Sequence, residues 1–170
     1  YMFSSDGLRL KSSSSSFCWV LAPRSETITA ASLSPESHTL ALGTQCGAVH
    51  LYAIGNDLSQ HKLRTLSLAE WGHTGQSSGV VESVRWTADG RAMAIVWEKA
   101  GLSVWTASGC RLMYHLEGHT GQKKEATAAA AGRRAVCWSP EGLQLVASSR
   151  RDPSRVLLFS FARAALNSSP

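Results

Sequence analysis

The side chains best suited to chemistry in this sequence are two histidines that share one five-residue motif. Gly72-His73-Thr74-Gly75-Gln76 returns 46 residues later as Gly118-His119-Thr120-Gly121-Gln122. A histidine works as a general base only when a nucleophile or a paired carboxylate lies within hydrogen-bond reach. Neither accompanies His73 or His119 in the sequence, so we predict no catalytic residue.

The sequence also lacks the patterns that hold cofactors and metals. No Gly-Lys-Ser/Thr follows a predicted strand and no GxGxxG is present, so neither phosphate-binding loop is expected and we predict no cofactor. Cys18, Cys46, Cys110 and Cys137 show no CxxC spacing and no paired histidines, which makes a metal site the weaker interpretation. We expect free thiols in a reducing compartment, with Cys46, Cys110 and Cys137 buried in or beside strands.

The chain contains a unit that occurs three times at a spacing of about 52 residues. Each unit has a strand, a tight Pro, Asp or Gly turn, a buried strand, a second turn and a strand that ends in an aromatic residue. A fixed period of this size is typical of stacked supersecondary units. The three units run from Leu33-Ser34-Pro35 to Tyr52, from Trp86-Thr87-Ala88-Asp89-Gly90 to Trp105, and from Trp138-Ser139-Pro140 to Phe159.

The second unit predicts four antiparallel strands, at 81–86, 93–97, 102–105 and 111–116. Four short strands per repeat is the pattern of a propeller blade. We therefore predict an all-β fold of about three β-propeller blades, an incomplete propeller. An open β-meander or a sandwich is the alternative. The expected blade core is Leu33, Tyr52, Trp86, Trp97, Trp105, Trp138 and Phe159.

The repeats divide the chain into a poorly matched segment at 1–27, three degenerate blades at 28–166 and a tail at 167–170. The first segment contains five serines in a row at 12–16, which predicts a linker. Propellers typically need about 4–8 blades, so we expect this chain to be a piece of a larger protein. The long connection at 55–79 contains Trp71, a candidate partner contact, although an aromatic ring tucked over the blade is an equal alternative.

The chain is basic, with a net charge of +5, and the excess lies mostly in loops. Basic loops of this kind can contact phosphates or an anionic membrane surface. No nucleic-acid motif accompanies them, so solvated loops are the favoured interpretation. A propeller that binds nucleic acid through these loops stays an alternative. An enzyme would need acidic residues clustered in the channel, and only 12 Asp and Glu are present. The sequence contains no stretch of 18 apolar residues, so we predict no membrane span.

Two resemblances emerge from these residues. The Gly-His pairs resemble the WD40 signature, but they lie 14 and 20 residues before the repeat tryptophans, and Trp105 precedes threonine instead of aspartate, so the repeats are degenerate. More specifically, residues 28–166 resemble the ribosome control protein one family, the WD40-containing subunit of the Golgi Rab-six guanine nucleotide exchange complex. The strings that carry this resemblance are Gly47-Ala48-Val49-His50-Leu51-Tyr52, Arg85-Trp86 with Asp89, Val96-Trp97-Glu98-Lys99-Ala100-Gly101-Leu102-Ser103-Val104-Trp105, Cys110-Arg111-Leu112 and the stretch 138–161.

The resemblance implies a non-catalytic scaffold that pairs with an arrestin-like partner subunit. Together the two would stimulate GDP release from a Golgi Rab GTPase in endosome-to-Golgi retrograde transport, in the cytoplasm and peripherally on the Golgi membrane. Since no nucleic-acid motif is present, we expect no nucleic acid as a partner, and whether the chain itself touches the membrane surface stays open. The alternative is a generic WD40-like trafficking adaptor without exchange activity.

Overall fold

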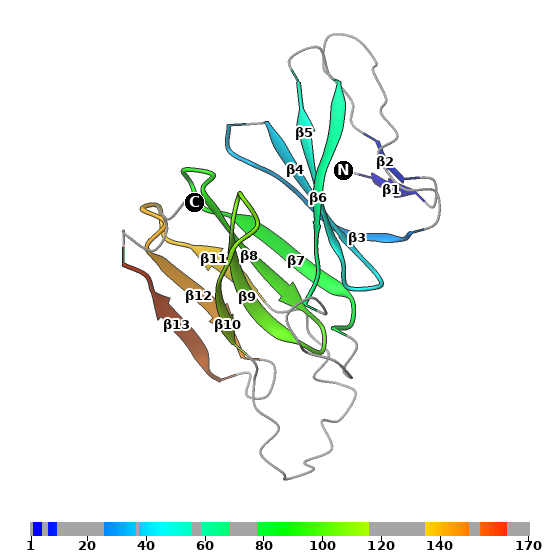
Figure 1. Ribbon diagram of the computed structural model, residues 1–170. Coiled ribbons are helices and arrows are strands. Elements are labelled where there is room, and N and C mark those ends of the chain that lie inside the picture. The colour runs from blue at the N-terminus through cyan, green and yellow to red at the C-terminus, as the bar shows by residue number, and fades with distance from the viewer. Residues whose placement is uncertain are drawn as a thin grey trace.

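The computed structural model describes residues 2–4, 7–9, 26–36, 38–55, 59–68, 78–115, 135–149 and 154–162. In these ranges the chain forms strands and the turns that join them (Figure 1). The serine run, Cys18, Trp71, His73 and His119 lie outside the described residues. The strands are β1 Met2–Ser4, β2 Gly7–Arg9, β3 Ile28–Leu33, β4 Thr39–Thr44, β5 Val49–Ile54, β6 Gln60–Leu66, β7 Val81–Trp86, β8 Ala92–Trp97, β9 Gly101–Thr106, β10 Arg111–His115, β11 Val136–Trp138, β12 Gln144–Ser148 and β13 Val156–Ser160.

The strands from β3 onward form three antiparallel sheets, each a meander in chain order. Blade one is β3-β4-β5-β6, blade two is β7-β8-β9-β10 and blade three is β11-β12-β13. The first two blades therefore have the four strands that the repeat predicted, and the predicted all-β, WD40-like fold is confirmed. A separate hairpin pairs β1 with β2.

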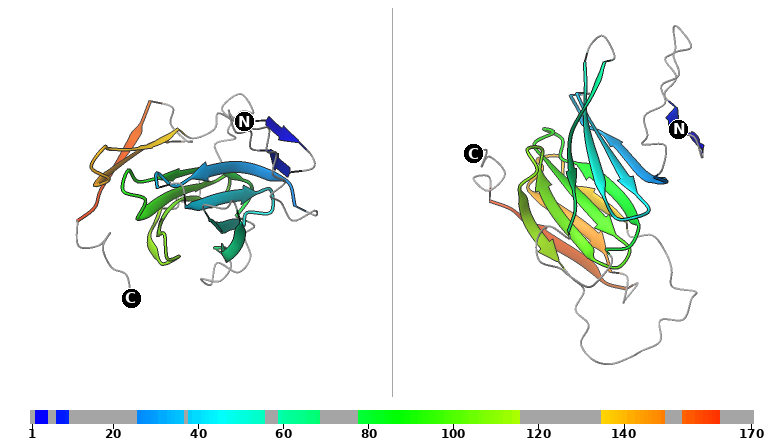
Figure 2. Two further views of the ribbon diagram at one scale, coloured as in Figure 1. Left: turned by 90° about the horizontal axis from the view of Figure 1, so that it is seen from above. Right: turned by 45° about the vertical axis from the view of Figure 1, so that its right-hand side comes forward.

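The blades stand side by side, with blade two between the other two (Figures 1 and 2). Their first strands lie at the junctions, where β7 contacts both β3 and β11. Two hydrophobic cores fill the spaces between neighbouring blades. One joins blades one and two around Leu51, Ile95 and Trp97, and the other joins blades two and three around Val104 and Leu145.

The first turn of every blade is closed by the same side-chain bond. The hydroxyl oxygen of Ser34, Thr87 or Ser139 accepts a hydrogen bond, 3.1 Å long in each case, from the amide five residues later. Hydroxyl side chains favour such turns because they bond nearby backbone without needing a second strand. Gly90 supplies the positive φ of 69° that the turn in blade two requires. The repeat therefore fixes the hairpins locally, and the hairpins set the strand register.

Candidate functional site

The strand register places six of the predicted core residues in three equivalent rows. In each blade the last residue of the first strand faces one residue of the second strand, which in turn faces an aromatic residue of the third. The rows are Leu33–Leu40–Tyr52, Trp86–Met93–Trp105 and Trp138–Leu145–Phe159. In blades two and three this row faces the preceding blade. The rows therefore form the junctions between blades.

Two of these tryptophans also connect neighbouring blades by the same hydrogen bond. The indole Nε1–H of Trp86 donates to the carbonyl oxygen of Ser32 at 3.1 Å, and that of Trp138 donates to the carbonyl oxygen of Arg85 at 3.0 Å. Ser32 and Arg85 occupy equivalent positions, each one residue before the row. The bond satisfies the indole N–H of each tryptophan and fixes the position of each blade relative to the blade before it.

Trp97 makes a different inter-blade bond from the end of β8. Its Nε1–H donates to the carbonyl oxygen of Gly47 at 2.9 Å, and its side chain is fully buried. Gly47 lies in the turn between β4 and β5, with a positive φ of 85°. Trp105 instead donates to Ser103 Oγ within its own strand, at 2.6 Å.

The position of Leu33 corrects one prediction. We expected Leu33 in the blade core, but its side chain is 44% exposed. Its row lies on the face of blade one that points away from blade two, and no blade of the described chain covers that face. The other predicted core residues of the rows divide in two: Trp86 and Trp105 are buried, whereas Tyr52, Trp138 and Phe159 are half-buried. A repeat position does not by itself produce burial, because burial needs a neighbour.

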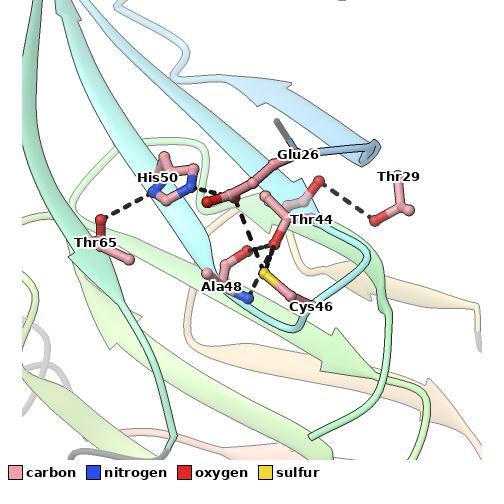
Figure 3. Close-up of polar contacts among 8 residues, drawn as sticks. Glu26, Thr29, Thr44, Cys46, Ala48, His50 and Thr65 are labelled. Atoms are coloured by element: carbon pink, nitrogen blue, oxygen red, sulfur yellow. Dashed lines mark hydrogen bonds and ion pairs between the residues drawn. The ribbon is translucent and has the colours of Figure 1, made fainter. Parts of the chain in front are cut away.

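A polar cluster that the sequence did not reveal lies on this same face of blade one (Figure 3). His50 of β5 is buried, and its Nε2 lies 2.7 Å from Oε2 of Glu26, just before β3. Its Nδ1 lies 2.9 Å from Thr65 Oγ1 on β6. The cluster thus ties the entry into blade one to that blade's two outer strands. The available signal was a polar residue inside the strand pattern of 49–54, where histidine replaces an apolar side chain.

The same cluster continues into the turn between β4 and β5. Thr44 Oγ1 accepts from the Ala48 amide at 3.1 Å, donates to the Ala48 carbonyl at 3.0 Å and lies 3.0 Å from Cys46 Sγ. Burial, with the charge of Glu26 second, raises the pKa of Tyr52 above its ordinary value. Because both ring nitrogens of His50 are engaged, the arrangement braces the fold and presents no nitrogen to a substrate.

The cysteines correct a second prediction. Cys46, Cys110 and Cys137 are free, as expected, but all three are exposed instead of buried. Cys46 and Cys110 lie in hairpin turns, and Cys137 points out of the open face of blade three. Within the described ranges no three His, Cys, Asp or Glu side chains are arranged to hold a metal ion. The same part of the chain contains no helix long and apolar enough to cross a membrane.

Comparison with known proteins identifies relatives of one kind. The chain is 28% identical over 152 residues to the guanine nucleotide exchange factor subunit RIC1 of Mus musculus, and 27% identical to RIC1 of Homo sapiens. Each match spans 77% of this chain but only 10% of the relative. No family model matches the chain. The chain is thus similar to a segment of RIC1, which confirms the family resemblance inferred from the sequence motifs.

Solved structures of WD40 proteins share the fold. The chain superposes on a chain of the mitotic checkpoint complex with a TM-score of 0.58 and 17% identity, covering 87% of this chain and 38% of that one. The RRP9 WD40 repeats and U3-55K each give a TM-score of 0.60, at 16% and 17% identity, and cover 82% of this chain and 37% and 38% of theirs. At this identity the likeness shows the fold alone.

Proposed function

We propose that this chain is a propeller scaffold segment of a guanine nucleotide exchange complex for a Golgi Rab GTPase. The complex would support endosome-to-Golgi retrograde transport, with the chain in the cytoplasm and peripheral on the Golgi membrane. The observation that carries the proposal is the similarity to RIC1 across 77% of the chain. The relatives are named as subunits, which supports a partner subunit, and we propose that this partner is arrestin-like.

The blade architecture suits exchange by binding. An exchange factor accelerates GDP release by stabilising the nucleotide-free GTPase, so it needs differential contacts with two states of its partner and no acid, base or nucleophile. A rigid set of blades that presents turns and outer strands supplies such contacts. The inter-blade bonds of Trp86, Trp97 and Trp138 hold these surfaces in register. Catalytic residues and cofactors have no part in the proposal.

The test measures GDP release from the Golgi Rab by the full-length product of the gene, bound to its partner subunit. The complex is prepared with and without residues 28–166, and its assembly is checked separately by size-exclusion chromatography. We expect faster GDP release only when the segment is present. If the complex assembles and release is equally fast without it, the segment is a peripheral trafficking adaptor and the exchange proposal is wrong for these residues.

A point variant makes the same test without a deletion. Trp97→Ala removes a fully buried anchor between blades one and two, whereas Leu63→Ala changes an exposed side chain on β6. We expect Trp97→Ala to slow exchange in proportion to the loss of folded protein and Leu63→Ala to leave it unchanged. A Trp97→Ala complex that is visibly unfolded yet fully active would contradict the scaffold role.

A further inference from the structure

The outermost strand of blade one presents an open sheet edge. β6 pairs with β5 on one side, and no described strand pairs with its other side (Figure 1). Its residues 61–64 are all exposed, whereas every residue of β10, the outermost strand of blade two, is half-buried. An edge strand leaves a row of backbone N–H and C=O groups with which another strand can pair. We call the outer side of residues 60–66 the β6 edge.

The side chains along the β6 edge are basic. The strand carries His61, Lys62 and Arg64 and no acidic residue. Within the described part of the chain, no carboxylate forms an ion pair with Lys62 or Arg64. Opposite charges on neighbouring strands stabilise their pairing, so two cations at an open edge favour an acidic strand beside them.

A β-bulge sends the two cations to opposite faces of the sheet. Lys62 pairs with Tyr52 of β5, and Arg64 pairs with Leu51. Leu63, between the two cations, is the extra residue of the bulge. Because Leu51 and Tyr52 are consecutive, their side chains lie on opposite faces, and so do those of their partners. An added strand alternates in the same way, so two adjacent acidic residues on it would reach both cations.

The neighbouring blade and β5 hold this part of β6 in place. A Cβ atom at Gly109, in the turn between β9 and β10, would lie 2.7 Å from Cδ and 2.5 Å from Nη1 of Arg64. The Arg64 side chain therefore runs across the backbone of that turn, where glycine leaves room for it. Next in the strand, Thr65 Oγ1 lies 2.9 Å from Nδ1 of His50 on β5. Groups that are already ordered lose less conformational entropy on binding.

We propose that the β6 edge binds an acidic, extended segment of a partner protein, which adds to the four strands of blade one as a fifth. Backbone hydrogen bonds join the segment to β6, and adjacent Asp or Glu residues of the segment contact Lys62 and Arg64. The proposal concerns a binding surface and goes beyond guanine nucleotide exchange. It holds or fails whether or not the chain takes part in exchange.

Other occupants fit the β6 edge less well. If the edges of two copies of this chain paired, the basic residues of one strand would lie beside those of the other, and like charges opposed across strands destabilise pairing. The phosphate groups of a nucleic acid or a lipid offer only hydrogen-bond acceptors. They would meet the two cations and the backbone N–H groups but leave the backbone C=O groups without donors. An acidic peptide supplies donors, acceptors and negative charge together.

Binding of short synthetic peptides to the full-length product of the gene tests the proposal. The probe is a fluorescent peptide of about ten residues, the length of a long strand, with two adjacent glutamates among valines and threonines. One control peptide has lysines in place of the glutamates, and a second has the acidic sequence with N-methyl groups on its central backbone nitrogens. We expect fluorescence anisotropy to detect binding of the acidic peptide, and each control to bind roughly tenfold or more weakly.

Charge reversal on β6 shows whether the peptide binds at this edge. Lys62→Glu turns an attraction into a repulsion and should weaken binding of the acidic peptide roughly fivefold or more. Lys99→Glu makes an equal change of charge at an exposed position in the turn between β8 and β9, and should leave binding unchanged. Leu63→Ala keeps both cations and the backbone of β6 and should also bind normally. Circular dichroism melting checks that each variant is folded.

Two results would overturn the proposal. One is equal binding of the acidic peptide by Lys62→Glu and the unaltered protein, or equal binding of the acidic and N-methylated peptides, since charge and backbone pairing would then not both contribute. The other is no binding of the acidic peptide together with binding of phosphatidylserine vesicles or duplex DNA that Lys62→Glu abolishes. That result would assign the β6 edge to a phosphate-bearing partner.

Discussion

Removal of the Trp97 side chain should weaken the junction between blades one and two. Trp97 is fully buried in their shared core, and its indole N–H donates to the Gly47 carbonyl at 2.9 Å. Trp97→Phe keeps most of the ring but leaves this buried carbonyl without its partner, which costs about 1–3 kcal/mol. Trp97→Ala also opens a large cavity and should cost at least about 3–5 kcal/mol. Because the free energy of unfolding of a domain is only about 5–15 kcal/mol, the alanine variant should lose a large part of it.

Urea unfolding, followed by the fluorescence of the remaining tryptophans, measures both losses. For a chain of this length the phenylalanine variant should also melt roughly 2–12 °C lower. Leu63→Ala, at an exposed position on β6, is the matched control and should stay within about 0.5 kcal/mol of the unaltered chain. If Trp97→Phe unfolds at the same urea concentration and with the same slope as the unaltered chain, the inter-blade bond contributes nothing and the reasoning is refuted.

Three further predictions concern other positions. Trp105→Ala should cost about 3–5 kcal/mol, because the ring is buried in the same core, and an unchanged melting temperature would contradict its assignment to the core. Gly43→Ala should lower the free energy of unfolding in urea by about 1–3 kcal/mol, since the added methyl would lie 2.7 Å from Val81 Cβ. An unchanged free energy of unfolding would show that β4 and β7 can move apart. The pKa of Asp89 is lowered: burial, the largest influence, raises it, but the hydrogen bonds from Thr87 Oγ1 and the Arg91 amide outweigh that effect. The stability that Asp89 contributes is therefore complete above its unfolded pKa near 3.8 and is lost as the pH falls through its lower folded pKa. Asp89→Asn should therefore flatten the acid side of a plot of unfolding free energy against pH. An acid side that is the same in the variant and the unaltered chain would exclude this contribution of Asp89.

The strands and turns could be predicted because their causes are local. In the turn at 87–90 the hydroxyl and the carboxylate form hydrogen bonds within the turn, and the glycine adopts a positive φ. The spacing of these residues alone therefore indicates a hairpin. The strand from Ala92 to Trp97 is an apolar run bounded by two such turns, and its predicted limits agree with the structure to within one residue. The predicted division into 1–27, 28–166 and 167–170 stays a prediction.

The burial of His50 could not be predicted because its hydrogen-bond partners are distant in the sequence. His50 is acceptable inside blade one only because Glu26 and Thr65, 24 and 15 residues distant, meet its two ring nitrogens. The exposure of Cys137 has a similar origin, since it depends on which face of β11 receives a neighbour. A single strand pattern identifies two faces but not which of them will be covered.

The sequence by itself determined the repeat, the hairpins and the equivalence of Leu33, Trp86 and Trp138, because turn chemistry and side-chain alternation act within a few residues. Only the tertiary structure decided which of these three equivalent positions is buried and which forms an inter-blade hydrogen bond. Trp86 is buried against blade one and bonds Ser32, Trp138 is half-buried and bonds Arg85, and Leu33 is exposed. The physical reason is that burial and inter-blade hydrogen bonds belong to a pair of blades, so the same residue position has a different energy depending on whether a neighbour stands against it.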